Sequence, residues 1–473
     1  MMRTVFASTL LVCHCIWSVG NVASGAEVFR TDRDVFRTAI RESERWTEAC
    51  AVDSVPALLT LEEMIERVLC HDPQVRHAWA DAKYQATIVK VKQSAYLPRL
   101  RGSAGITSGH NDTPYEKNEG YSSHGHQRQL ENRLGLSWVL FDFGRREAAL
   151  RNAQLLLVAA NAKQDNQLQE AFVMAAQLYY DALAAQGHQI ASRKVTILAA
   201  ENLKAADAKY AAGAAALSDR LQAQTAYSQA RLNEVRSDGT LRKARGNIAL
   251  RMGLRPQTPL ELAGSLSRRP GTQFIKSVDD LLQQARREHP SLVGAKAKLD
   301  AAKAAIDESH AAGRPTVSFI ANISEVKTNQ SMAYNGDRRV RDNSVSLQLH
   351  IPLFEGFERA HLTRGAQAQF EASESDLWDV EQRISLGLWA NYQTLSIETS
   401  SLESTAERVE QSSQTLRVVQ ERYNAGVGNM IELLNSLNAY AIAEQQHINT
   451  LNRWHLARLR LAASLGRLGF WAL

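Results

Sequence analysis

The chain has 473 residues and a formal net charge of only +5, with 22% charged and 7% aromatic residues. Its hydrophobic share of 44% consists mainly of Ala and Leu, which is typical of long helices packed through small side chains rather than of a thick globular core. The small net charge and the lack of a dense basic block argue against nucleic-acid binding.

Residues 1–26 are predicted to form a secretory signal peptide. Arg3 supplies the positive start, residues 5–19 are almost wholly apolar, and the small residues at 23–26 offer a cleavage site after Ala26. A membrane anchor is the alternative, but the apolar run is short for a bilayer span. No later run of about 18 apolar residues exists, so we expect no transmembrane helix in the mature chain.

Two cysteines remain after cleavage. Cys13 and Cys15 leave with the signal peptide, whereas Cys50 and Cys70 stay in an oxidising compartment. We predict a Cys50–Cys70 disulfide that ties an N-terminal extracytoplasmic segment, residues 27–56, to the first helix. The alternative is a pair of buried free thiols.

An internal repeat organises the rest of the chain. Pro73 has a counterpart in Pro290, 217 residues later (290 − 73), and Pro98 has one in Pro315 at the same offset. Further segments match at an offset of 213 (426 − 213), namely 140–144 with 353–356, 209–213 with 422–426, and 251–254 with 464–467. We therefore expect two related halves, residues 57–273 and 274–473.

Each half is predicted to contain the same series of elements. A helix comes first, over residues 58–97 and 278–312, with apolar residues at helical spacing. Two alternating segments then form a β-hairpin, over residues 99–141 and 316–354. Each hairpin is followed by a long helical hairpin, over residues 144–254 and 356–468.

The alternating segments favour strands that cross a membrane. Apolar residues recur at every second position, at Leu134, Leu136, Trp138 and Leu140 and again at 347–353. Strands of about ten residues with one apolar face fit a transmembrane β-barrel. An ordinary periplasmic sheet with one solvent-exposed face remains the alternative. Four strands cannot close a barrel, so several chains would have to share one.

The helices after the hairpins are unusually long. Residues 144–213 would extend roughly 100 Å as one unbroken helix, and residues 356–426 are similar. Gly213 and Gly426 lie where a helix C-cap is expected. Each helical hairpin is thus long enough to cross a periplasm. The alternative, an all-helical structural protein, gives no reason for two β-hairpins.

The ordered set of short motifs, present twice, resembles the TolC family of outer-membrane channel proteins. The motifs are the segment from Leu61 to Pro73, the Leu-Phe pairs that end at Phe141 and Phe354 and are followed by a Gly, and the Tyr-x-x-Gly turns at Tyr210 and Tyr423. The resemblance covers essentially the whole mature chain. It implies a mainly α fold with a minor β part: a homotrimer with a shared twelve-stranded barrel and a periplasmic helical tunnel, closed at its inner end until a partner opens it.

The resemblance also implies where the tunnel closes. The first gate acid of the family falls on Glu432, and the second falls on Asn435, which is not acidic. Tyr423 matches the tyrosine of the closing contacts, with Ser218 and Asp219 as its partners, so we expect a Tyr423–Asp219 hydrogen bond. The basic residue of that contact falls on Gly428, which predicts a lost ion pair. Glu432 and Asp219 are equally explained as acids favoured at helix N-termini.

Two small, apolar turns resemble the surface on which the family's periplasmic adaptor docks, and simple turn chemistry is the alternative. Their residues are Gly213, Ala214, Ala215, Gly426, Val427 and Gly428. No enzyme motif, cofactor site or metal site is predicted. His124 and His126 are expected to be solvated in a hairpin loop.

The favoured function is the outer-membrane duct of a type I secretion system. Such a duct would pass an unfolded polypeptide, such as a toxin, from an inner-membrane ABC transporter and a periplasmic adaptor, the membrane fusion protein, to the outside. The second hypothesis is the outer-membrane channel of a drug or metal efflux pump. The third is a periplasmic coiled-coil adaptor or scaffold. Neighbouring genes would distinguish the first two.

Overall fold

A computed structural model describes residues 58–113, 123–264, 278–330 and 338–466. The predicted signal peptide, the segment 27–56 and Cys50 lie outside these residues. Cys70 is disulfide-bonded, and its pairing with Cys50 stays a prediction.

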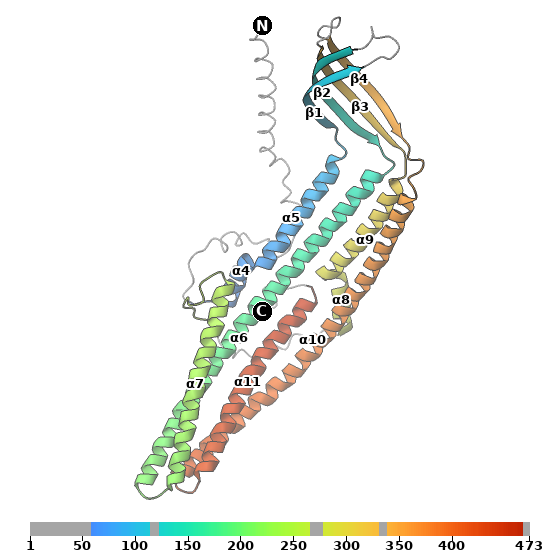
Figure 1. The fold of residues 1–473 in the computed structure, drawn as a ribbon. Helices are drawn as coiled ribbons and strands as arrows, with labels where there is room; N and C mark the ends of the chain where they lie inside the picture. Colours follow the sequence, from blue (N-terminus) through green and yellow to red (C-terminus); the bar gives the residue numbers. More distant parts are fainter. Residues whose placement is uncertain (1–57, 114–122, 265–277, 331–337, 467–473) are drawn as a thin grey trace. The chain divides into compact units, whose positions relative to one another are not determined.

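The described chain is mainly helical and has one four-stranded sheet, which confirms the predicted fold class (Figure 1). The first half contains α4 (Leu61–His71), α5 (Pro73–Ser94), β1 (Arg99–Thr113), β2 (Ser123–Phe141), α6 (Arg145–Ala211) and α7 (Leu217–Arg251). The second contains α8 (Val278–Glu288), α9 (Pro290–Ala311), β3 (Thr316–Gln330), β4 (Arg338–His350), α10 (Glu358–Asn424) and α11 (Met430–Ser464). The same order of elements recurs in both halves.

The single helix predicted at the start of each half is wrong, because a proline divides it. Pro73 and Pro290 each begin a new helix, since proline lacks the backbone N–H and disfavours a helical residue before it. The residue before each proline caps the new helix. Asp72 Oδ1 accepts the N–H groups of Gln74 (2.8 Å) and Val75 (3.1 Å), whereas His289 Nδ1 accepts the N–H of Ser291 (3.2 Å).

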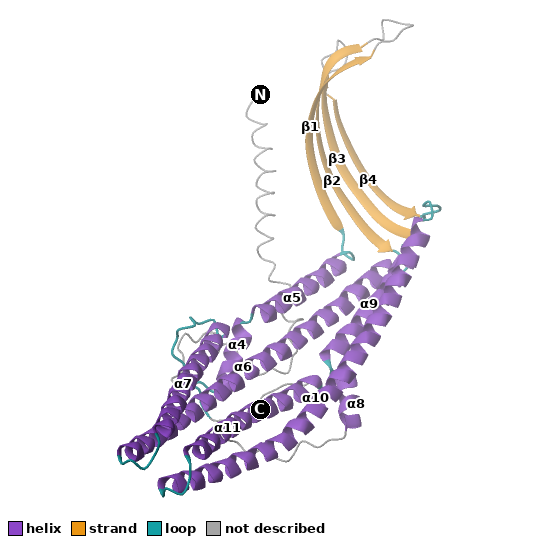
Figure 2. Cartoon of the chain, turned by 60° about the horizontal axis from the view of Figure 1, so that its bottom comes forward, coloured by secondary structure: helices purple, strands orange, loops and turns teal. Residues whose placement is uncertain are grey.

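The four strands form one antiparallel sheet in the order β1-β2-β3-β4 (Figure 2). They are longer than the expected ten residues, at 15, 19, 15 and 13 residues. The second hairpin ends earlier than the predicted residue 354, because β4 stops at His350, two residues before Pro352, which cannot donate a ladder hydrogen bond.

The chain divides into two compact units, and both halves of the sequence contribute to each. The sheet unit contains Lys83–Ala159 and Ala295–Asp376 among its segments, and the tip unit contains Ala160–Gly294 and Leu377–Leu473 among its segments. The division of the sequence at residues 273 and 274 remains a proposal about the origin of the repeat.

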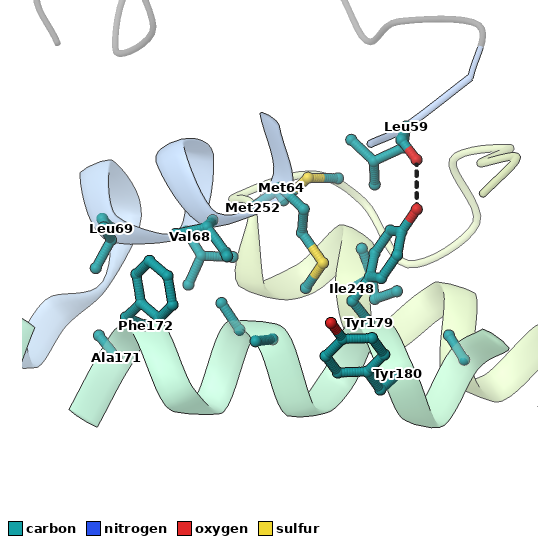
Figure 3. Packing of buried hydrophobic residues seen from close by; sticks show 14 of the residues in the cluster. Leu59, Met64, Val68, Leu69, Ala171, Phe172, Tyr179, Tyr180, Ile248 and Met252 are labelled. Carbon is teal, nitrogen blue, oxygen red and sulfur yellow. Dashed lines mark hydrogen bonds between the residues drawn. The ribbon is translucent and has the colours of Figure 1, made fainter. Parts of the chain in front are cut away.

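The main core of the tip unit joins α4, α6 and the end of α7 (Figure 3). Val68 and Leu69 of α4 lie beside Phe172 of α6, and small buried residues such as Ala175 allow the helices to approach closely. The hydroxyl of Tyr179 donates to the carbonyl oxygen of Leu59 at 3.1 Å. Burial of a ring such as Phe172 contributes about 2–3 kcal/mol. None of the described helices is both long and apolar enough to cross a membrane.

Candidate functional site

The predicted gate and docking residues lie in two helix–turn–helix segments of the tip unit. The first tip, residues 207–220, joins α6 to α7, and the second tip, residues 420–433, joins α10 to α11. Gly213 has a φ of +72° and Gly426 a φ of +82°. The next residue's N–H donates back into the helix end, from Ala214 to Lys209 O (2.8 Å) and from Val427 to Arg422 O (3.0 Å). Both helices therefore end with a C-capping glycine in the left-handed conformation.

One apolar cluster connects the two tips. The first half contributes small residues, and the second contributes larger ones. The buried members are Ala199, Ala206, Ala223, Ala230, Leu416, Val419, Tyr423, Met430, Leu433, Leu437 and Tyr440. The cluster holds α10 and α11 against α6 and α7, which places the predicted gate residues of both halves in one packed region.

Tyr423 is the centre of this region, with only 3% of its surface exposed. The Lys209 ammonium lies 4.1 Å from its ring centroid and also donates to the Tyr423 carbonyl oxygen. Lys209 thus joins the first half to the last turn of α10, where the helix dipole favours a cation.

The expected Tyr423–Asp219 hydrogen bond is not formed. Among the described residues, the Tyr423 hydroxyl is buried without a hydrogen-bond partner, while Asp219 accepts the Ser218 hydroxyl at 3.4 Å. Burial raises the pKa of Tyr423, and the charge of Asp219 raises it further. Asp219 therefore acts on Tyr423 through its field rather than through a hydrogen bond.

Glu432 is partly covered and paired. Its Oε1 accepts Arg422 Nη1 at 2.9 Å, and its backbone N–H donates to Asn429 Oδ1 at 2.8 Å, the N-cap of α11. Glu432 is thus a first-turn acid of α11 that also pairs with Arg422 across the turn, and its role as a gate acid stays a prediction. Asn435 is exposed further along α11.

Three cationic residues at the tips, Lys209, Arg220 and Arg422, were not predicted as site residues from the sequence. Lys209 and Arg422 occupy the same repeat position, one residue before the tip tyrosines, which is a signal that could have found them. Arg220 Nε donates to Asp207 Oδ1 at 2.7 Å, and its guanidinium lies 5.5 Å from the Tyr210 ring centroid.

The docking turns are open on their outer side. Ala214, Gly426 and Val427 are exposed, and Ala215 is half-buried. Gly428 differs, because a Cβ there would lie 2.9 Å from the backbone N of Tyr423. This turn therefore leaves no space for a side chain at the position where the resemblance places a basic residue.

The paired histidines lie elsewhere than expected. His124 and His126 belong to strand β2 rather than to a loop, and the His126 ring contacts that of His110 of β1, with ring centroids 4.9 Å apart and the planes tilted by 53°. Within the described ranges, no group of three or more His, Cys, Asp or Glu could hold a metal ion.

Comparison with known proteins identifies relatives along nearly the whole chain. The family model for outer membrane efflux proteins matches residues 64–254 and 281–467. Protein CyaE of Bordetella pertussis is 30% identical over 87% of this chain and 85% of its own length. The alkaline protease secretion protein AprF of Pseudomonas aeruginosa is 24% identical over 85% of this chain and 82% of its own length.

Solved structures show the same fold. The outer-membrane channel OprN superposes with a TM-score of 0.73 at 18% identity, over 91% of this chain and 93% of its own. The Campylobacter jejuni CmeC outer membrane channel also gives 0.73, at 13% identity, over 89% of this chain and 91% of its own.

Proposed function

The chain belongs to the outer membrane efflux protein family, the TolC family, and we propose that it exports polypeptides in a type I secretion system. It is an outer-membrane transport channel with a periplasmic extension, and family members form homotrimers within tripartite systems. The observation that carries the proposal is similarity over most of both chains to AprF, whose name states protease secretion. Membership of this channel family excludes the third hypothesis, a periplasmic coiled-coil adaptor or scaffold.

The sheet supports a barrel shared by three copies. Strands β1 and β4 form the two edges of the sheet, and an edge strand presents unpaired backbone groups that another chain can pair with. Pairing β4 of one copy with β1 of the next would close twelve strands and remove every edge.

Helix α10 supports the same assembly in the tip unit. Four large apolar side chains, Trp378, Leu386, Trp389 and Ile397, are exposed in the single chain. At 100° per residue they fall on one face of the helix. Large apolar side chains that recur on one exposed face favour a protein interface, and the proposed occupant is a second copy of this chain.

The two tips form the proposed periplasmic gate. Lys209 of the first tip donates a hydrogen bond to the Tyr423 carbonyl oxygen of the second tip, and Arg422 forms an ion pair with Glu432 across the turn. Three copies of Glu432 around a narrow axis would favour cations. The turns at Gly213–Ala215 and Gly426–Gly428 are the proposed docking surface for the periplasmic adaptor, whose binding would separate the two tips.

Deletion of the gene tests the proposed substrate class. We expect one or a few large polypeptides to disappear from the culture supernatant, measured by mass spectrometry, and to return when the wild-type gene is restored. Susceptibility to drugs and metals should stay unchanged. An unchanged supernatant together with increased drug or metal sensitivity would instead assign the channel to efflux.

A further inference from the structure

The sheet has one apolar and one polar face, because side chains alternate along each strand. The cross-strand register places Leu134 opposite Ile323 and Ile323 opposite Asn343. The apolar face, defined by this register, contains Leu100, Ile106, Leu134, Leu136, Trp138, Val317, Phe319, Ala321, Ile323, Val345, Leu347 and Leu349. In the proposed barrel this face lies against lipid.

Aromatic side chains mark the end of the sheet that adjoins the helices. Trp138 Nε1 donates to the Tyr96 carbonyl oxygen at 2.9 Å. Phe141 contacts Phe143, and Phe354 contacts Phe357, with ring centroids 4.6 Å and 5.5 Å apart. Exposed aromatic rings of this kind are enriched at membrane–water interfaces. This end therefore lies at the periplasmic surface, since the helices are the periplasmic part.

A basic cluster lies on the same face toward the opposite end of the strands. Glu325 and Lys327 continue the alternation from Ile323, and the register pairs them with Arg341 and Arg339. Glu325 Oε1 contacts Lys327 Nζ and Arg339 Nε, both at 3.2 Å, and its Oε2 contacts Arg341 Nε at 3.1 Å. One carboxylate thus holds three cations from two strands in fixed positions.

The cluster keeps a positive excess that faces outward. Three cations surround one anion, and Arg128 of β2 lies on the same face by register. The side chains of Lys327, Arg339 and Arg341 are 44%, 51% and 66% exposed, whereas that of Glu325 is 25% exposed. The positive charges are therefore accessible, and the carboxylate that positions them is the more covered group.

The depth of these charges in the membrane determines which lipid groups they can contact. Charged residues on the lipid face of a barrel are costly at the bilayer centre and nearly neutral at the headgroup level. Glu325 lies eight positions along β3 from Val317, which is paired with Phe141 (325 − 317), and twelve residues separate Arg341 from Phe354. These separations are close to the roughly nine to eleven residues of a tilted membrane-crossing strand. The cluster therefore lies at the outer headgroup level, where guanidinium groups bind phosphate through paired hydrogen bonds.

We propose that Lys327, Arg339 and Arg341, positioned by Glu325, bind the phosphate groups of a phosphorylated lipid in the outer leaflet. The proposal rests on the proposed function, because it requires the sheet to lie in the outer membrane. Bound lipid would neutralise the excess charge and anchor each copy at a fixed depth.

Binding of lipid A, a bisphosphorylated glycolipid, to the purified detergent-solubilised protein tests this proposal. The variant Lys327→Gln/Arg339→Gln/Arg341→Gln is compared with wild type by native mass spectrometry titration. The matched control, Arg101→Gln/Arg133→Gln/Arg338→Gln, removes three charges from the polar face. We expect the first variant to bind at least about tenfold more weakly and the control to bind like wild type.

Further measurements identify the source of the phosphate and distinguish a failure of the lipid-binding proposal from a failure of the proposed channel function. Dephosphorylated lipid should bind wild type as weakly as lipid A binds the triple variant, and inorganic phosphate should not compete at equal concentration. Equal binding of lipid A to both triple variants would overturn the proposal, as would competition by inorganic phosphate. Channel conductance in zwitterionic bilayers is measured on the same samples. Wild type that fails to conduct there would contradict the channel function instead.

Discussion

Tyr210 and Tyr423 occupy the same position in the two halves of the chain, yet the first is 39% exposed and the second 3%. The turns after them have the same left-handed glycine cap, at Gly213 and Gly426. Their neighbours differ at matched positions, 213 residues apart. Arg220 of the first tip corresponds to the buried Leu433, and Ala215 corresponds to Gly428.

These differences show which parts of a duplicated tip are fixed by backbone chemistry. A helix end that needs a positive φ keeps its glycine in both copies. The side-chain contacts have diverged, because an arginine at position 220 makes a solvated ion pair, whereas a leucine at position 433 extends the apolar cluster. The second tip thus has a buried tyrosine, and the first tip contributes the lysine that covers it.

Truncating the two tyrosines should give the largest contrast. We expect Tyr423→Ala to lower the local opening free energy of the second tip by about 3 kcal/mol, since it leaves a cavity in the cluster. Tyr210→Ala should change the first tip by less than about 1 kcal/mol. Hydrogen exchange over residues 411–440 and 200–230 measures both. Equal effects at the two tips would remove the distinction between them.

Exchanging the small residues of the turns should have the next largest effect. Gly428→Ala places a Cβ against the Tyr423 backbone, so we expect it to destabilise the second tip by about 1–3 kcal/mol. Ala215→Gly should cost the first tip only a few tenths of a kcal/mol through the flexibility of the unfolded turn. A well-tolerated Gly428→Ala, with unchanged exchange rates, would show that this turn relaxes freely.

Removing the cation that joins the tips should have a moderate effect. Lys209→Met keeps the side-chain stem but loses the bond to the Tyr423 carbonyl, and we expect about 1 kcal/mol less protection of the last turn of α10. Lys204→Met, an exposed position on the same helix, is the matched control. Loss of protection in the control alone would contradict the role given to Lys209.

An effect no larger than that of Lys209→Met is expected from pH, which should act differently on the two proline junctions. Burial lowers the pKa of His289, and its Nδ1 must be unprotonated to cap α9. The folded-state pKa is below the unfolded one, so this contribution is present above about pH 6.5 and is lost as pH falls through the folded pKa.

We therefore expect about 1 kcal/mol less protection of the first turn of α9 at acid pH, from exchange rates corrected for intrinsic pH dependence. His289→Asn retains a capping acceptor that does not titrate, and it should abolish this dependence. The same loss in His289→Asn would assign the effect to another group.

Much of the fold follows from local chemistry, and the contacts of the site do not. Glycines at 144 and 213 bracket α6 almost at its observed ends, because they mark a turn and a C-cap. Pro73 was visible, but the apolar periodicity continues across it and suggested one helix. The Lys209–Tyr423 contact joins residues 214 positions apart, and only packing of the four helices brings them together.

Single-channel conductance of the purified protein in planar bilayers tests the central claim, a membrane channel held closed at its tips. Wild type should show small, cation-selective steps. Lys209→Met should show larger steps, Glu432→Ala should show reduced cation selectivity, and Lys204→Met should behave like wild type. Protein that extracts without detergent and gives no conductance would contradict the channel. Identical, unselective steps in all four proteins would retain the channel but contradict a gate at Lys209, Tyr423 and Glu432.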